Sequence, residues 1–406
     1  MEAYERLLEY AAVVTDSDEE GVGTPSTPRQ HELARRLAEE MRGMGLSDVH
    51  ADGHAYVYGK LPATPGLERC TAIGLIAHLD TVPVPEGVPV RPAVIRDYDG
   101  GEVPLGDSGL TLSPGMFPHL EELRGQTLIV TDGNTVLGAD DKAGIAEILT
   151  ALERILAGGV PHGPISVCFT PDAEIGHGAA LLDLERLGAE YAYTVDGGDM
   201  AEIEFETFNA AAAKWVIRGV SVHPGSAKGA MKNAAAIAAE IAMSLPREET
   251  PERTEGYEGF YHLCDMEGDV SRAEMSFIIR DHDRSRFEAR KQVMVSLAED
   301  INARYGEGTA ELVLRDQYYN MAEKIGEHPE VLDKARAAIE AAGMTPVSQP
   351  VRGGTDGSQL SFRGLPCPNL GTGGFCFHGP YEHITAERMD RAVEVLLHLA
   401  ERYAEE

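Results

Sequence analysis

The sequence predicts an α/β domain with a smaller α+β domain inserted into it. Apolar strand-like segments alternate with helix-like segments over residues 72–195, which indicates a parallel sheet. Over about 207–320 the pattern changes to the β-α-β-β-α-β order of a ferredoxin-like unit. A chain of 406 residues also exceeds the size at which single cores stop growing. We therefore expect residues 1–207 and 320–406 to form one domain and residues 208–319 the other.

Each expected element has a local signal. Residues 4–14 show helical periodicity, and a second helix starts near Ser26 and Pro28 and ends by Gly43 or Gly45. The large domain should then contain strand 72–78, helix 142–156, strand 165–170, helix 179–187, strand 191–195 and a last helix over 385–404. The inserted domain should contain strand 214–220, helix 229–245, strands 266–272 and 275–281, helix 283–304 and strand 310–316.

Composition excludes several classes of protein. Lys and Arg number 35 against 67 Asp and Glu, and the net charge of −32 argues against nucleic acid or an anionic membrane as the main partner. We see neither an apolar run of about 18 residues nor a basic, signal-like N-terminus, so we expect a cytoplasmic protein with no membrane partner. The five scattered cysteines form no CxxC pair and are expected to be buried thiols.

Polar side chains follow the expected strands of the large domain. His78 and Asp80 come at the end of strand 72–78, and two residues spaced i and i+2 on a strand share one face. Glu174 follows strand 165–170, and Asp196 ends the strand that starts at residue 191. Functional sites of open α/β sheets lie at the carboxyl ends of strands, so these side chains should meet.

Two more residues complete a candidate metal centre. Asp140 lies where an extended segment turns into a helix, and His378 lies in a glycine-rich loop before the last helix. Each of these motifs alone is equally compatible with a helix cap or a surface position. Together, five nitrogen and oxygen donors suit a zinc-type site. If Asp140 bridges two ions, His78 and Asp196 could hold one, and Glu174 and His378 the other. The bridging hydroxide that such sites use as a nucleophile would then balance the remaining positive charge.

These motifs, in their order and spacing, resemble the M20 superfamily of di-zinc peptidases, and within it the tripeptide aminopeptidases. The resemblance covers essentially the whole chain. It is carried by GADDKAGIAEI (138–148), TVDGG (194–198), VHPGSAKG (222–229), TEGYEGFYHL (254–263), RGGTDGSQLSF (352–362) and GLPCPNLGTGG (364–374).

The resemblance implies a zinc-peptidase-type catalytic domain with a mixed sheet and a ferredoxin-like lid domain that forms a homodimer. It implies removal of the N-terminal residue from tripeptides, with two Zn²⁺ per chain for which Co²⁺ or Mn²⁺ could substitute. It also implies that Asp80 is a second active-site carboxylate and that a cis peptide joins Asp140 to Asp141. The metal ligands that it implies are His78, Asp140, Glu174, Asp196 and His378.

One position departs from the family pattern. The family has two consecutive glutamates after Pro-Asp, the first a general base and the second a zinc ligand, whereas this chain reads Pro171-Asp172-Ala173-Glu174. Alanine cannot carry a proton, and loss of a general base typically costs about 10²- to 10⁴-fold in rate. Three explanations stay open: an engineered knockout, a naturally inactive peptide-binding relative, or an enzyme with another proton carrier such as Asp172.

A tripeptide carboxylate needs cationic partners even in an acidic protein. The candidates are Arg280 and Arg352, since guanidinium groups bind carboxylates well, and His223. In the family, a lid histidine like His223 polarises the scissile carbonyl in the neighbouring subunit. Arg280 could equally form a surface ion pair, and His223 could cap a local turn. We expect supporting or core positions for Asp172, Trp215, His282 and His383.

Two other functions stay open. The chain could be another M20 hydrolase, namely a dipeptidase, carboxypeptidase or N-deacylase, or a non-catalytic peptide-binding protein. Release of the N-terminal residue from a tripeptide, by this chain and by its Ala173→Glu variant, would discriminate among them.

Overall fold

The computed structural model describes residues 1–85 and 88–405. The chain divides into two compact units, one of Met1–Phe205, Glu323–Gln349 and Thr355–Glu406, the other of Glu206–Ala322 and Pro350–Gly354. Their architecture confirms the predicted fold class, a mixed-sheet α/β domain with an inserted ferredoxin-like α+β domain. The segment Pro350–Gly354 belongs to the second unit, whereas the sequence analysis placed it in the larger domain.

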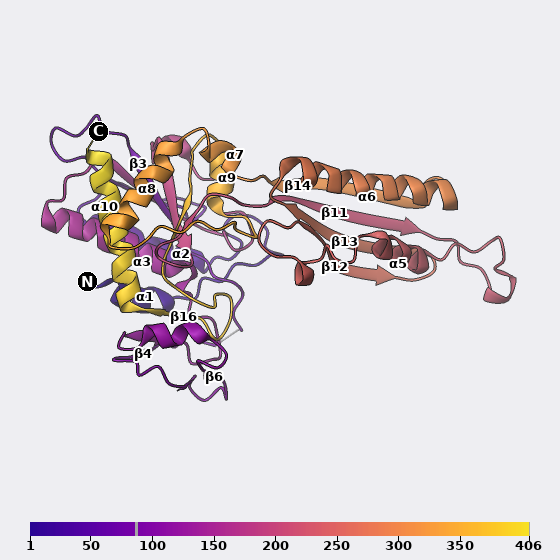
Figure 1. Cartoon of the computed structure of the whole chain (residues 1–406), viewed down its shortest axis with the longest axis horizontal. Helices are drawn as coiled ribbons and strands as arrows, with labels where there is room; N and C mark the ends of the chain where they lie inside the picture. Colours follow the sequence, from indigo (N-terminus) through magenta and orange to yellow (C-terminus); the bar gives the residue numbers. More distant parts are fainter. Residues whose placement is uncertain (86–87, 406) are drawn as a thin grey trace. The chain divides into compact units, whose positions relative to one another are not determined.

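The larger unit is built on a seven-stranded mixed sheet with the order β1-β2-β8-β3-β9-β15-β10. Figure 1 labels strand β3 of this sheet and the helices α1, α3 and α10 of the same unit. Neighbours among β8, β3, β9 and β15 are parallel, and β1, β2 and β10 pair antiparallel. All residues of β3 are buried, as expected for an apolar strand in the middle of a covered sheet. The strands are β1 (Ser47–Ala51), β2 (Val57–Leu61), β3 (Ile73–His78), β8 (Ile165–Thr170), β9 (Tyr191–Gly197), β10 (Ile203–Glu204) and β15 (Asn369–Gly371).

Helices of this unit pack on the sheet and on one another: α3 contacts β3 and β9, and α1 and α10 contact α3. The helices are α1 (Ala3–Ala11), α2 (Gln30–Met44), η1 (Pro118–Leu123), α3 (Ala139–Gly158), α4 (Leu184–Leu187), α8 (Pro329–Ala341), α9 (Asp356–Phe362) and α10 (Ala386–Ala404), with α7 (Ala322–Ile325) at the division between units. Two smaller sheets are formed by β4 (Ala93–Ile95), β7 (Leu128–Val130) and β16 (His383–Thr385), and by β5 (Val103–Pro104) and β6 (Thr111–Leu112).

The second unit has an antiparallel four-stranded sheet with the order β12-β13-β11-β14. Trp215 is fully buried in its core, as expected, together with Ile237 from α5 and Phe287 and Met294 from α6. Its elements are β11 (Asn209–Arg218), η2 (Pro224–Ser226), α5 (Ala234–Ser244), η3 (Pro251–Arg253), β12 (Phe260–Gly268), β13 (Arg272–Asp281), α6 (Arg284–Tyr305) and β14 (Ala310–Tyr318).

Several local expectations are wrong. The strand expected at 266–272 is β12, which ends at Gly268, because the Asp269 carboxylate accepts hydrogen bonds from the backbone of Ser271 and Arg272 and so closes a turn. The helix expected over 179–187 is only the four-residue α4. Of the five cysteines, only Cys168 and Cys367 are buried; Cys70 and Cys376 are half-buried, and Cys264 is exposed.

Across residues 1–85 and 88–405, none of the helices combines the length and the apolar character that a membrane crossing needs.

Candidate metal centre

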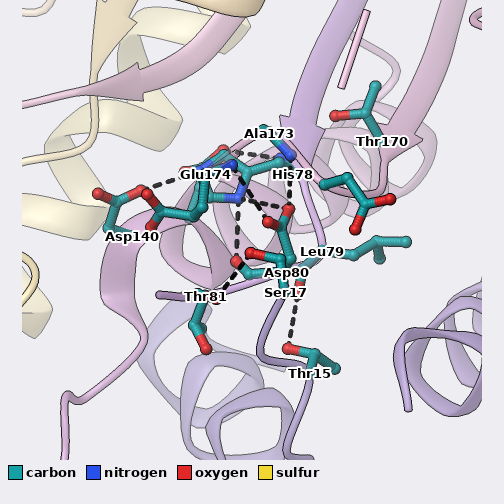
Figure 2. A network of polar contacts seen from close by, with 12 residues as sticks. Thr15, Ser17, His78, Leu79, Asp80, Thr81, Asp140, Thr170, Ala173 and Glu174 are labelled. Carbon is teal, nitrogen blue, oxygen red and sulfur yellow. Dashed lines mark hydrogen bonds and ion pairs between the residues drawn. The ribbon is translucent and has the colours of Figure 1, made fainter. Parts of the chain in front are cut away.

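Three neighbouring parallel strands deliver polar side chains to one edge of the large sheet. His78 is the last residue of β3, Glu174 follows the end of β8, and Asp196 lies near the end of β9. Because β3 pairs in parallel with both β8 and β9, their carboxyl ends meet. Asp140 joins them from the start of α3, whose regular helical conformation begins only after Asp141. Figure 2 shows His78, Asp140 and Glu174 turned toward one another.

The Asp140 carboxylate lies between two histidines. Its Oδ1 is 2.9 Å from His78 Nε2, and its Oδ2 is 2.9 Å from His378 Nε2. His78 Nε2 is also 3.4 Å from Asp196 Oδ1, and His378 Nε2 is 3.1 Å from Glu174 Oε2. The structure therefore brings together all five side chains that the sequence singled out, in two histidine–carboxylate pairs that share Asp140.

The crowding of these groups perturbs their protonation. Burial, with further contributions from Asp140 and Glu174, raises the pKa of Asp196 to about 7. Hydrogen bonds to Asp140 and Glu174 raise the pKa of His378 to about 10. Burial alone would lower the pKa of His78, but Asp196 and Asp140 raise it well above its ordinary value. The cluster thus favours positive charge at its centre.

The residues fit a pair of cations on chemical grounds. The Glu174 Oε1 atom is buried and has no hydrogen-bond partner among the described residues. His78, Asp140 and Glu174 place one potential ligand atom each within 4.8 Å of one another, and His78, Asp141 and Asp196 do the same. Imidazole and carboxylate ligands are those that zinc takes in catalytic sites.

Asp80 organises two sides of the site. It is fully buried, and its carboxylate accepts hydrogen bonds from the backbone N–H groups of Ala173 (2.9 Å) and Glu174 (3.1 Å). His78 Nδ1 lies 3.0 Å from the Asp80 carbonyl oxygen and 3.4 Å from Asp80 Oδ1. Because Nδ1 faces Asp80, Nε2 is the ring nitrogen that could bind a metal ion once the ion displaces its proton.

Two carboxylates that the sequence analysis did not single out also hold the site. Glu382 is buried and accepts hydrogen bonds from the backbone of Leu137, Gly138 and Asp140, which fixes the loop that leads into α3. Asp141 accepts hydrogen bonds from the backbone of His78 and Gly144. The Asp140–Asp141 peptide is cis, as the family resemblance implied. The signal for Glu382 was its place four residues after His378, in the same loop.

Ala173 is half-buried beside the cluster, and the neighbouring carboxylate of Asp172 is held by other residues. Asp172 is fully buried, and it accepts hydrogen bonds from Ser26 N (2.7 Å), Ser26 Oγ (2.6 Å) and Gln30 Nε2 (2.6 Å). Its φ is 56°, in the left-handed region that non-glycine residues adopt rarely. The Asp172 carboxylate is thus occupied by Ser26 and Gln30, and its supporting role stays a prediction.

The three expected substrate-binding residues belong to the second unit. His223 is exposed, and its Nδ1 accepts a hydrogen bond from Gly225 N. The Arg352 guanidinium donates to the carbonyls of Gly256 and Glu258 and to Thr254 Oγ1.

Among the described residues, Arg280 has no ion-pair partner, so the surface ion pair that was considered for it is not seen there. Its Nη1 donates to the carbonyls of Ala211 and Ile279 and to Gln317 Oε1, and the guanidinium lies over the Tyr318 ring.

Comparison with known proteins identifies the family to which this chain is similar. The peptidase dimerisation domain model matches residues 205–309. Peptidase T of Salmonella enteritidis PT4 is 50% identical over 398 residues, which cover 98% of this chain and 97% of that protein. Peptidase T of Bacillus velezensis is 49% identical over 406 residues, which cover 100% and 99%.

Solved structures share the fold. A tripeptidase from Staphylococcus aureus aligns with a TM-score of 0.79 at 22% identity, covering 100% of this chain and 98% of that chain. A dinuclear metal binding peptidase of the M20 family from Bacillus subtilis aligns with a TM-score of 0.65 at 15% identity, covering 99% and 98%. The M20 resemblance is thereby confirmed, and with about half of its residues identical to those of such relatives over nearly its whole length, the chain belongs to the peptidase T family.

Proposed function

We propose that this chain is a zinc-dependent aminopeptidase that releases the N-terminal residue from tripeptides. The observation that carries the proposal is the Asp140 carboxylate, whose two oxygens face two different histidines, each backed by a further carboxylate. The substrate class comes from the peptidase T relatives. We further propose a cytoplasmic location, and a homodimer formed through residues 208–319 as a lid, with residues 1–207 and 320–406 as the catalytic domain.

Two cations per chain fit the cluster. We assign His78 and Asp196 to one Zn²⁺, Glu174 and His378 to the other, and Asp140 to both. Bound there, the ions would polarise the scissile carbonyl and lower the pKa of the attacking water.

The chain's own residues position this chemistry. Asp80 fixes both the ring of His78 and the backbone of residues 173 and 174. The methyl group of Ala173 can neither take a proton from the attacking water nor give one to the leaving amine. We therefore expect activity about 10²- to 10⁴-fold below that of a variant with glutamate at this position.

Substrate contacts are proposed for the second unit. Because Nδ1 of His223 accepts a backbone hydrogen bond, its neutral ring carries the proton on Nε2, which can donate to a substrate carbonyl. Arg280 and Arg352 remain candidates for the substrate carboxylate, and Arg352 would have to release part of its hold on the 254–258 segment.

The decisive experiment compares three proteins on one tripeptide with zinc present: this chain, Ala173→Glu and Ala173→Gln. Chromatography of the released N-terminal residue should show a gain of about 10²- to 10⁴-fold for Ala173→Glu. The glutamine of Ala173→Gln has nearly the size of glutamate but cannot take the proton of the attacking water. The rate of this variant should therefore stay at the level of the parent. Equal rates for the two variants would contradict the role of position 173.

A second candidate function is supported by Ala173 itself, namely a peptide-binding protein without catalysis. In that case calorimetry would show tripeptide binding, while neither the parent nor Ala173→Glu would release product. Another M20 hydrolase would instead cleave dipeptides or N-acyl amino acids faster than tripeptides, which a substrate panel measures.

Metal content and assembly test the remaining parts. Metal analysis after dialysis should find at least two Zn²⁺ per chain, and Asp140→Asn should retain fewer than the parent because it weakens the shared ligand. Sedimentation should give a dimer. A parent protein that holds less than one divalent ion per chain would overturn the metal centre.

A further inference from the structure

A second cluster of metal-binding side chains lies outside the centre just described. His119, Cys376 and His383 each place one potential ligand atom within 4.8 Å of the others. His119 comes from η1, Cys376 from the loop that carries His378, and His383 from the first position of β16. These three residues share no member with the five proposed zinc ligands.

The two histidine rings meet through their Nε2 atoms. His383 Nδ1 donates to the carbonyl of Tyr381 at 2.7 Å, so its Nε2 carries the free lone pair, which faces His119 Nε2 at 2.9 Å. His383 is fully buried, and this burial lowers its pKa to about 4, which keeps the ring neutral at physiological pH.

Aromatic packing holds these rings in place. The His119 ring stacks on Phe375 with centroids 4.2 Å apart and lies nearly parallel to the His383 ring, at 7°. The Phe117 ring meets His383 edge-on at 6.4 Å. Ligands fixed in this way lose little conformational entropy on binding an ion.

Cys376 supplies a third ligand of a different kind. Its thiol is half-buried and makes no hydrogen bond to another described residue. Its backbone has a φ of 55°, the left-handed conformation that a non-glycine residue adopts rarely. One thiolate and two imidazoles form a ligand set that zinc accepts, with a fourth position left for water.

We propose that His119, Cys376 and His383 form a third cation site that takes Zn²⁺. Binding would release the thiol proton of Cys376 to solvent. It would also replace the hydrogen bond between the two Nε2 atoms, with the His119 proton moving to Nδ1 by exchange with water.

The position of the site gives it a consequence for the catalytic centre. Phe375 and His383 pair through two backbone hydrogen bonds, of 2.9 and 3.1 Å, and so close the loop that contains His378. An ion on Cys376 and His383 ties both ends of this loop to each other and to η1. The third site therefore restrains the loop that presents His378.

Cobalt is the probe that separates this site from the proposed catalytic centre. A thiolate bound to Co²⁺ gives a charge-transfer absorption in the near ultraviolet, and the set of His78, Asp140, Glu174, Asp196 and His378 contains no thiolate. Titration of the metal-free protein with Co²⁺ should give this band and three ions per chain. Cys376→Ser should lose the band and one ion and keep the other two. Cys70→Ser, which changes a half-buried cysteine elsewhere in the same unit, should keep the band.

A second variant guards against misfolding. His119→Phe preserves the aromatic stack and should also lose the band and one ion. Absence of the band in the parent, or its survival in Cys376→Ser, would overturn the third site. Binding of two Co²⁺ ions per chain without the thiolate band would reject the third site and support the catalytic centre. Binding of one Co²⁺ ion with the band would support the third site and reject the catalytic centre.

Discussion

Glu147 offers a sharp test of the structure, because its carboxyl group is deeply buried. It lies in α3, its exposed fraction is zero, and neither of its carboxylate oxygens has a hydrogen-bond partner among the described residues. Burial, with a smaller contribution from Asp390, raises its pKa well above the ordinary value of 4.5. We predict that Glu147→Gln stabilises the protein at neutral pH.

The sign and size follow from proton linkage. The folded protein binds the Glu147 proton more tightly than the unfolded chain does, so this group's contribution to stability is fully present below pH 4.5 and is lost as the pH rises through the raised pKa. Over that interval the parent should lose about 1.4 kcal/mol relative to Glu147→Gln for each pH unit. Glu147→Leu also removes the unpaired polar atoms, which is worth about 1–3 kcal/mol more.

The assay is urea unfolding, followed by far-ultraviolet circular dichroism, of parent and variant at pH 4.5, 6 and 7.5. The free energies of unfolding are compared at each pH, because the other titrating groups are common to both proteins and cancel in the difference. The difference should be smallest at pH 4.5 and should grow with pH.

A matched control lies on the same helix. Glu153 binds the N-terminal amine at 2.8 Å, and this hydrogen bond lowers its pKa. Glu153→Gln should therefore cost stability at neutral pH, by no more than about 1 kcal/mol because the pair is exposed, and the cost should shrink as the pH falls. If Glu147→Gln instead destabilises the protein by an amount independent of pH, the carboxyl group has a partner and the reasoning is refuted.

Three further outcomes are expected. Trp215→Ala should destabilise the second unit by about 3–5 kcal/mol, seen as an earlier calorimetric transition, because the side chain is fully buried. In the Ala173→Glu background, Asp172→Asn should leave the pH profile of kcat unchanged, since Asp172 is occupied by Ser26 and Gln30; a shifted profile would make it a proton carrier. Asp80→Asn should weaken zinc binding about 10- to 100-fold in a chelator competition, because it removes an acceptor that holds the residues around the metal; unchanged affinity would contradict this.

The sequence was most informative where apolar segments form neighbouring strands of one sheet. Residues 73–78, 165–170 and 191–197 form apolar strands whose ends carry His78, Glu174 and Asp196, so the edge of the sheet at which they meet could be predicted. The β-α-β-β-α-β order of the inserted unit was equally readable, because each of its strands alternates buried and exposed residues or pairs with one that does.

Other features depend on contacts between residues far apart in the chain. The hydrogen bonds of Glu382 to Leu137 and Asp140 join segments more than 240 positions apart. His119 and His383 are 264 positions apart, and nothing near either residue indicates the other. Strand β1 was missed for a different reason, since it is mostly exposed and lacks an apolar face.

The segment around position 173 is held by contacts that do not involve the side chain of this residue. The hydrogen bonds that fix this segment come from the backbone N–H groups of residues 173 and 174 to Asp80, and from Ser26 and Gln30 to the side chain of Asp172. None of them uses the side chain of residue 173. A glutamate introduced there would therefore enter a backbone that is already positioned, beside Glu174 and the shared Asp140. For this reason, failure of Ala173→Glu to gain activity would weigh against catalysis itself and not against the placement of the new carboxylate.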